Sequence, residues 1–238
     1  QQIRSITRKH LRSFRMNDTK KLNIQYPEEP IVSTWRCADD TMLKNIIKTL
    51  LPNGNKHIIL IDGRSGNGKS TFANKIVTLF NASLVRTDDI AWHYHQIDWD
   101  TILINNIINP WLTGQNVLYR PPGWHTKHRK GGIQVDTSNV LVIEGVGAGR
   151  ASLATYSSLI IWVQANNQLV YDRALQRDMK AEGRNRQQAE DFWVKWKLHE
   201  DPFLAQDRPW SRAQLIINGT APNTSITSTC YTHGPLKP

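Results

Sequence analysis

The chain has 238 residues, of which 39% are hydrophobic, and it carries a formal net charge of +10. This length suffices for one large domain with a sizeable core, or for one domain with appendages. No apolar run approaches the roughly 18 residues of a membrane span, so an integral membrane protein is excluded. Cys37 and Cys230 are too few for a disulfide framework. We therefore expect reduced thiols and a cytoplasmic protein, with a bridge between the two as the less favoured alternative.

Much of the positive charge lies at the beginning of the chain. Seven Lys and Arg residues fall within the first 21 residues, where Asp18 is the only acid. We expect residues 1–37 to form a basic arm and linker that is partly disordered. An arm that binds nucleic acid is the less favoured alternative, and Met16 is a second candidate for the start of the protein. Residues 38–220 are predicted to form the domain and 221–238 a polar tail.

The remaining elements follow from hydrophobic periodicity and from turn residues. Helices are predicted from Asp40 to Leu51, over Lys69–Phe80, Thr101–Leu112, Gln168–Met179 and Gln187–His199. Strands are predicted over Ile58–Ile61, Ser83–Arg86, Asn116–Tyr119, Val140–Ile143, Leu159–Val163 and Leu215–Ile217. Most of these strands are nearly continuous in apolar residues and alternate with helices. This pattern is typical of an α/β fold in which helices cover both faces of a parallel sheet.

A glycine-rich segment follows the strand at 58–61 and leads into the helix at 69–80. Its residues Gly63, Arg64, Ser65, Gly66, Asn67, Gly68, Lys69 and Ser70 match the phosphate-loop pattern G-x-x-x-x-G-K-[ST], and Thr71 follows. Glycines allow backbone angles that turn N–H groups toward phosphate oxygens, and the helix N-terminus adds positive potential. Lys69 is expected to reach the β- and γ-phosphates, and the Ser70 hydroxyl to bind Mg²⁺. The sequence therefore predicts a site for ATP with Mg²⁺.

Two further strands end in carboxylates at the same edge of the predicted sheet. Asp88 and Asp89 follow the strand at 83–86, and either one could accept a proton from an attacking hydroxyl. Glu144 ends the strand at 140–143, where it is expected to hold Mg²⁺ directly or through water. These positions favour a kinase over a nucleotide-dependent switch.

A basic helix–turn segment is the third indication of phosphoryl transfer. Arg173, Arg177 and Arg184 lie around Gly183, where the chain is expected to reverse. Such a segment suits a lid that closes over the triphosphate and neutralises charge on the transferred group. A solvated helix face with ion pairs along the helix is the simpler interpretation of this segment alone.

Taken together, these motifs resemble the uridine kinase-like branch of the P-loop kinases. The resemblance rests on Asp62-Gly63-x-Ser65-Gly66-x-Gly68-Lys69-Ser70-Thr71, Thr87-Asp88, Glu144-Gly145 and Arg173-x-x-x-Arg177-Asp178 with Gly183-Arg184. Other segments look like uncharacterised uridine kinase-like ATP-binding proteins of actinobacteria, notably those at 87–93, 119–124, 142–149 and 202–210. The resemblance covers about residues 38–220 and implies a P-loop fold with a basic lid. It also implies that Asp88, rather than Asp89, is the catalytic base and that Arg177 and Arg184 are lid residues, with Arg173 beside the nucleotide.

The acceptor side departs from the uridine kinase pattern, which places Asp, His and Arg soon after a tyrosine. Here Arg120, Pro121 and Pro122 follow Tyr119, and Arg129 comes later. The residues predicted to contact the acceptor are Asp89, Trp92, His93, Tyr119, Arg120, Trp124 and Arg129. A nucleoside-like acceptor is expected first. A sugar, a cofactor precursor or a nucleoside monophosphate is an alternative, as is a regulatory ATP-binding module. The sequence leaves the oligomeric state open, a homodimer included.

Overall fold

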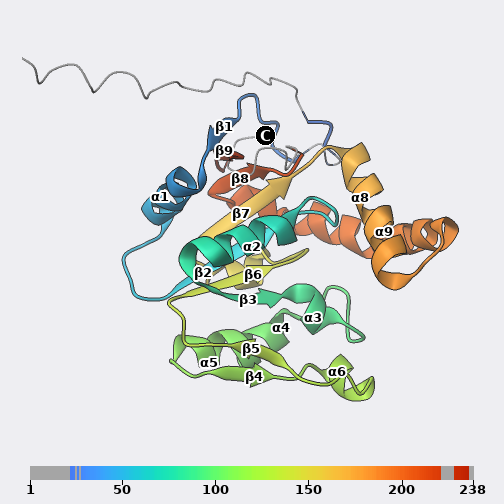
Figure 1. The fold of residues 1–238 in the computed structure, drawn as a ribbon, viewed down its shortest axis with the longest axis horizontal. Coiled ribbons are helices and arrows are strands. Elements are labelled where there is room, and N and C mark those ends of the chain that lie inside the picture. Colours follow the sequence, from blue (N-terminus) through green and yellow to red (C-terminus); the bar gives the residue numbers. More distant parts are fainter. Residues whose placement is uncertain (1–21, 25, 27, 221–227, 236–238) are drawn as a thin grey trace, which may run out of the picture.

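The computed structural model describes residues 22–24, 26, 28–220 and 228–235. Their main feature is a seven-stranded sheet in the order β1-β9-β8-β7-β2-β6-β3. Five consecutive strands are parallel, namely β8 (Leu215–Asn218), β7 (Leu159–Gln164), β2 (His57–Asp62), β6 (Val140–Glu144) and β3 (Ser83–Arg86), the last of which lies at the sheet's edge. In Figure 1 the strands lie one below another, with β1 uppermost and β3 lowest. The predicted α/β fold with a mostly parallel sheet is confirmed.

Both faces of the sheet are covered because the strand residues are apolar on both sides. Ile58 and Leu60 of β2 belong to one core cluster, and Ile59 and Ile61 belong to the other. Helices α1 (Asp40–Leu50) and α2 (Lys69–Phe80) pack on the second cluster through residues such as Ile47. The first cluster is closed by the middle helical segments and by part of the C-terminal helices.

A long helical stretch follows β3 and lies below it in Figure 1. The predicted helix at 101–112 is one continuous stretch in three parts, α4 (Asp100–Leu103), a π-helical turn (Ile104–Ile108) and α5 (Asn109–Leu112). A second, two-stranded antiparallel sheet lies beside it, formed by β4 (Val117–Tyr119) and β5 (Ile133–Val135). The short helices are α3 (Thr87–Ala91), α6 (Pro122–Thr126), α7 (Ala151–Ala154) and a 3₁₀ turn (Pro209–Arg212).

Two long helices, α8 (Asn167–Glu182) and α9 (Arg186–Asp207), lie at the right in Figure 1. Helix α8 ends at Gly183, which is left-handed with φ 65°, and Asn185 forms a capping box that starts α9. Helix α9 continues well past the predicted end at His199. Pro202 did not stop it, since one missing N–H is tolerated where tertiary packing supports the remaining turns.

The ends of the domain differ from the prediction. Tyr26, Glu29 and Val32 are buried, although residues 1–37 were expected to be an arm and linker. We call residues 26 and 28–32 the N-terminal strap. It leads into β1 (Arg36–Ala38), and the expected tail contains β9 (Thr229–His233), so both ends add strands to the sheet. The basic residues 1–21 lie outside the described residues.

A disulfide joins the two added strands. Cys37 of β1 faces Cys230 of β9 in the antiparallel register, and the two form a covalent bond across 193 positions of sequence. The expectation of two reduced thiols is therefore wrong for this structure. The bond was missed because β1 and β9 are short and polar, and their pairing depends on residues far apart in sequence. Within the described residues, no helix combines the length and apolar character needed to cross a bilayer.

Loss of this bond is expected to lower stability. Replacing Cys37→Ser together with Cys230→Ser should reduce the free energy of unfolding by about 2–4 kcal/mol, because the bond restricts a very long loop of the unfolded chain. Thermal unfolding with and without reductant measures the effect. The double variant provides the control, because its unfolding midpoint should not respond to reductant. Equal midpoints for the oxidised and reduced wild-type protein would contradict the prediction.

Candidate active site

The phosphate loop occupies the turn between β2 and α2, the strand–loop–helix context that its motif requires. Gly68 precedes α2 in a left-handed conformation (φ 93°), and no side chain caps the helix. The first N–H groups of α2 are therefore available to an anion. Gly66 is also left-handed (φ 85°), and a Cβ there would lie 2.5 Å from the Val170 carbonyl oxygen. Only glycine fits at this contact between the loop and α8.

Lys69 and Arg64 are both buried within the loop. Lys69 is 8% exposed, and its Nζ donates a 2.9 Å hydrogen bond to the Arg64 carbonyl. The Arg64 side chain is 1% exposed, donates to the Ala165 carbonyl at 3.4 Å and lies over the Tyr26 ring. Asn67 likewise donates to the Val163 carbonyl at 2.6 Å. For Arg64 and Asn67, the backbone is therefore the better candidate for phosphate contact.

The predicted metal ligands lie together at the start of α2 and the end of β6. Glu144 is buried, and burial raises the pKa of its carboxyl, while Lys69 and a hydrogen bond with Ser70 lower it. Arg86 contributes an ion pair at 3.4 Å. A hydroxyl beside a carboxylate is an oxygen donor set that suits Mg²⁺, which often uses few protein ligands together with phosphate oxygens. No cluster of three or more His, Cys, Asp or Glu residues suited to a metal occurs among the described residues.

Asp88, which the resemblance favours as the base, and Asp89 differ in their surroundings. Asp88 lies exposed in the first turn of α3, close enough to Glu144 to raise the pKa of that carboxyl. Asp89 forms an ion pair with Arg129 at 3.0 Å. A Cβ on Gly145 would lie 1.8 Å from the Thr87 hydroxyl oxygen, so glycine is what lets α3 approach the end of β6. Asp88 is thus the less constrained carboxylate beside the metal ligands.

The predicted acceptor residues form one cluster around Arg129. Its guanidinium lies 3.6 Å from the Trp124 ring centroid and 5.2 Å from that of Trp92. Arg120 donates to the Arg129 carbonyl at 2.7 Å, and Trp124 donates from its indole to the Asp89 carbonyl at 2.8 Å. Trp124 is itself buried, so its role in this cluster is support for Arg129.

Two other predicted acceptor residues lie at the margin of this cluster. His93 is exposed, has a left-handed backbone (φ 52°) and meets the Trp92 ring edge-on. Tyr119 is half-buried at the end of β4, and burial raises the pKa of its phenol. The structure thus joins six of the seven predicted acceptor residues by contacts beside α3, and Tyr119 precedes one of them, Arg120, in the chain.

Asp62 is a residue whose contacts the sequence did not indicate. Its fully buried carboxylate accepts N–H bonds from Gly63 at 2.6 Å, Gly147 at 2.9 Å and Gly149 at 2.8 Å. Burial raises its pKa to about 6, although these donors and Lys69 favour the charged form. Asp62 therefore joins the start of the phosphate loop to the loop after β6.

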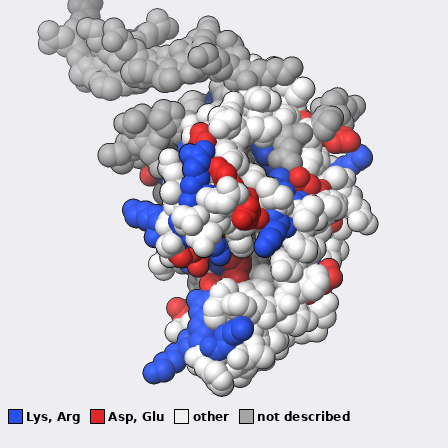
Figure 2. Space-filling model, turned by 90° about the vertical axis from the view of Figure 1, so that its right-hand side faces the viewer, with Lys and Arg blue, Asp and Glu red and all other residues white. Residues whose placement is uncertain are grey.

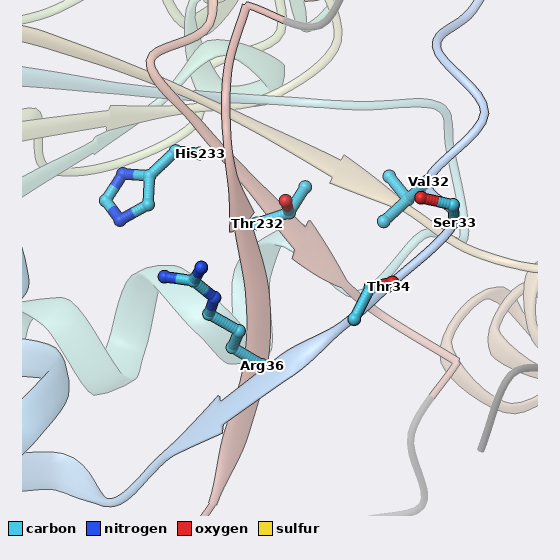
Figure 3. Close-up of a pocket in the computed structure, with 6 residues that line it drawn as sticks. All are labelled: Val32, Ser33, Thr34, Arg36, Thr232 and His233. Carbon is cyan, nitrogen blue, oxygen red and sulfur yellow. The ribbon is translucent and has the colours of Figure 1, made fainter. Parts of the chain in front are cut away.

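Figure 2 looks directly at the side of the molecule on which the predicted active-site residues lie. Basic side chains flank a recess in which acidic side chains are visible. A different pocket, of about 370 Å³, lies by β1 and β9 (Figure 3). It is lined by Val32, Ser33, Thr34, Arg36, Thr232 and His233. None of the residues predicted for phosphate transfer lines it, so we assign it no part in the reaction.

Comparison with known proteins decides the family. The model of the Phosphoribulokinase / Uridine kinase family matches residues 94–224, more than half of the chain. The chain belongs to this family. It is a P-loop kinase, although the phosphate loop itself precedes the matched residues. No curated protein sequence gives a significant match.

Two solved structures similar to this kinase are low in sequence identity. A putative fructose transport system kinase from Silicibacter sp. TM1040 is 17% identical, with a TM-score of 0.52, and the match covers 71% of this chain and 92% of that one. A possible uridine kinase from Bacillus stearothermophilus is 17% identical, with a TM-score of 0.49 and coverage of 74% and 96%. At this identity, the first of the two supports the fold alone.

The arginines predicted to form a lid lie on and after α8. Arg177 and Arg184 both approach the carboxylate of Asp178, each at 3.4 Å, and Arg184 also stacks on Phe192. Arg177 donates to the Ser65 hydroxyl at 3.3 Å. Arg173 donates to the Gly219 carbonyl at 2.7 Å, and burial lowers its pKa. Asp178 is thus a counter-charge that sequence reasoning missed.

We expect residues 177–190 to become more protected from hydrogen exchange when a non-hydrolysable ATP analogue binds. One carboxylate, Asp178, faces two guanidinium groups, so a triphosphate supplies the missing negative charge. Exchange measured by mass spectrometry with and without the analogue tests this expectation. Helix α1 is a control, because it lies on the opposite side of the sheet in Figure 1. Equal protection of the lid in both states would mean a permanently packed helix pair.

Proposed function

We propose that this kinase transfers the γ-phosphoryl group of ATP to a hydroxyl of a small, nucleoside-like acceptor. The observation that carries the proposal is the position of Asp88. It is an exposed carboxylate next to Glu144 and Ser70, at the strand edge that also carries the phosphate loop. A base must lie within reach of the hydroxyl that it deprotonates, and this edge is where the γ-phosphate would meet the acceptor.

In the proposed mechanism, each group has one task. The loop N–H groups and Lys69 bind the phosphates, and Asp88 accepts the proton of the attacking hydroxyl. Arg177 and Arg184 offset the negative charge that spreads over the transferred group. Ser70 and Glu144 would hold Mg²⁺, which neutralises phosphate charge when bound.

The Arg129 cluster supports an acceptor with both a flat and a hydroxylated part. Trp92 offers an aromatic face, and the Asp89–Arg129 pair offers a charged donor and acceptor side by side. A nucleoside combines a planar base with sugar hydroxyls, which is why we place it first. We propose a small-molecule partner, without a role for nucleic acid. The expectation of a cytoplasmic location rested on reduced thiols, and the Cys37–Cys230 bond removes that support.

A screen of acceptors for ADP release tests this proposal. The purified full chain is given Mg·ATP with nucleosides, sugars, cofactor precursors or nucleoside monophosphates, and the Lys69→Ala variant is run in parallel. ADP release that depends on a nucleoside and is absent from the variant would support the proposal. Release with sugars alone would reassign the acceptor, and no release with any class would contradict the kinase mechanism.

The basic arm provides a second test. A kinase without residues 1–21 should retain turnover, whereas a regulator acting through this arm should lose its partner. The deletion must stop there, because a cut at residue 37 would also remove the buried strap residues Tyr26 and Glu29 and one half of the disulfide. Loss of a binding partner by a folded deletion variant, with no acceptor-dependent turnover in the full chain, would favour the regulatory alternative.

A further inference from the structure

Glu200 of α9 is a fully buried carboxylate that contacts the phosphate loop. Its Oε1 accepts the backbone N–H of Ser65 at 2.6 Å, across 135 positions of sequence. Its Oε2 accepts from the Lys197 ammonium at 2.9 Å. Both oxygens are therefore engaged, which is the usual condition for keeping a carboxylate charged inside a protein.

The Ser65 N–H that Glu200 accepts belongs to the same peptide group whose carbonyl oxygen binds the Lys69 ammonium. The Arg64–Ser65 peptide donates its N–H to Glu200, and its carbonyl oxygen accepts the Lys69 ammonium at 2.9 Å. Because a peptide group is planar, fixing the N–H direction fixes the carbonyl direction as well. Glu200 thus sets the orientation of the group to which the phosphate-binding lysine is bonded.

Other contacts hold Glu200 and its helix in place. Lys197 also pairs with Asp201, which accepts a 2.6 Å hydrogen bond from the Tyr26 hydroxyl. The Tyr26 ring stacks on Trp210, with centroids 5.4 Å apart. The N-terminal strap therefore anchors the turn of α9 that carries Glu200.

We propose that Glu200 is a positioning residue that orients the phosphate loop for nucleotide binding. The proposal rests on the proposed binding of ATP by this loop. It assigns Glu200 no contact with substrate, since its effect passes through the Arg64–Ser65 peptide. Without this carboxylate, the peptide keeps only the bonds to its carbonyl oxygen, from Lys69 and from the Asn67 N–H at 3.1 Å. Its N–H end can then tilt, and Lys69 and the neighbouring N–H groups lose their common aim at the phosphates.

Calorimetric titration of the full chain with Mg·ATP tests the proposal. Glu200→Ala and Glu200→Asp should raise the Kd by about 10–100-fold, the range expected for a lost hydrogen bond to a charged group. Aspartate keeps the charge but withdraws the oxygen by one methylene. Glu200→Gln keeps an oxygen acceptor for Ser65 but turns an amide donor toward Lys197, so its Kd should lie between those of wild type and Glu200→Ala. The control is Asp40→Asn, which removes a carboxylate charge from α1, outside the predicted lid, where it pairs with Lys75.

Rescue by glutamine separates positioning from a general loss of packing. Thermal unfolding of each variant shows which ones are folded. If the Glu200→Ala variant is unfolded, the affinity of the Glu200→Asp variant tests the proposal. Wild-type affinity in the folded Asp or Ala variant would overturn the proposal, as would a Gln variant as weak as Ala. Failure of the wild-type protein to bind Mg·ATP would instead contradict the proposed function.

Discussion

Lys69→Ala is expected to abolish detectable turnover of Mg·ATP while the protein remains folded. The ammonium group is the only side-chain cation of the phosphate-loop motif that stands next to Ser70 and Glu144, and it lowers the pKa of Glu144. Alanine removes the charge that would contact the β- and γ-phosphates. The measurement is ADP release with the acceptor found by the screen.

The structure changes one part of this expectation. Lys69 is buried and bonded to the Arg64 carbonyl, so the substitution acts on stability as well. The variant removes one of two hydrogen bonds to that carbonyl, since the Asn67 N–H also donates to it at 3.1 Å, and this should cost about 1–3 kcal/mol of stability. Lys75→Ala is the matched control, because it lies on the same helix and pairs with Asp40 instead. Unchanged turnover in the folded Lys69→Ala variant would show that the phosphate site is assigned to the wrong residues.

Asp88→Asn is expected to lower turnover by about 10²–10⁴-fold, the usual range for loss of a general base. Affinity for ATP should change little, because Asp88 lies in the first turn of α3, outside the loop that binds the phosphates. Asparagine keeps the size of the side chain and removes its negative charge and its ability to accept a proton. Steady-state kinetics, with kcat and the KM for ATP reported separately, provide the measurement.

Asp89→Asn is the comparison that identifies the base. Its ion pair with Arg129 would be weakened, so the expected effect is mainly a higher KM for the acceptor. A stronger loss of kcat in this variant than in Asp88→Asn would show that the base is assigned to the wrong residue.

The phosphate loop was predictable because its information is local. Strand, glycine turn and helix lie within 24 consecutive residues, and the structure places α2 at Lys69–Phe80 and β3 at Ser83–Arg86, as the sequence predicts. In a parallel sheet the carboxyl ends of the strands lie at the same edge. That geometry brings Asp88 and Glu144 together although they are far apart in sequence.

The contacts that shape the loop were not predictable in the same way. Asp62 receives N–H groups from Gly147 and Gly149, and Ser65 donates to Glu200 across 135 positions. No periodicity or motif encodes such partners, since they depend on how distant segments pack. The polar strands β1 and β9 were missed for the same reason. The sequence feature that could have indicated a structural role for Asp62 was its position between the buried strand and the phosphate loop.

The Cys37–Cys230 bond encloses nearly the whole catalytic domain in one covalent ring. A protease that cuts a surface loop between these residues, such as the exposed stretch at 125–128, therefore opens the ring without releasing a fragment. The nicked chain would migrate as a single species until a reductant is added, and then as two. The disulfide would keep β1 and β9 beside each other after the cut. The segments that build the phosphate site would therefore remain tethered to one another.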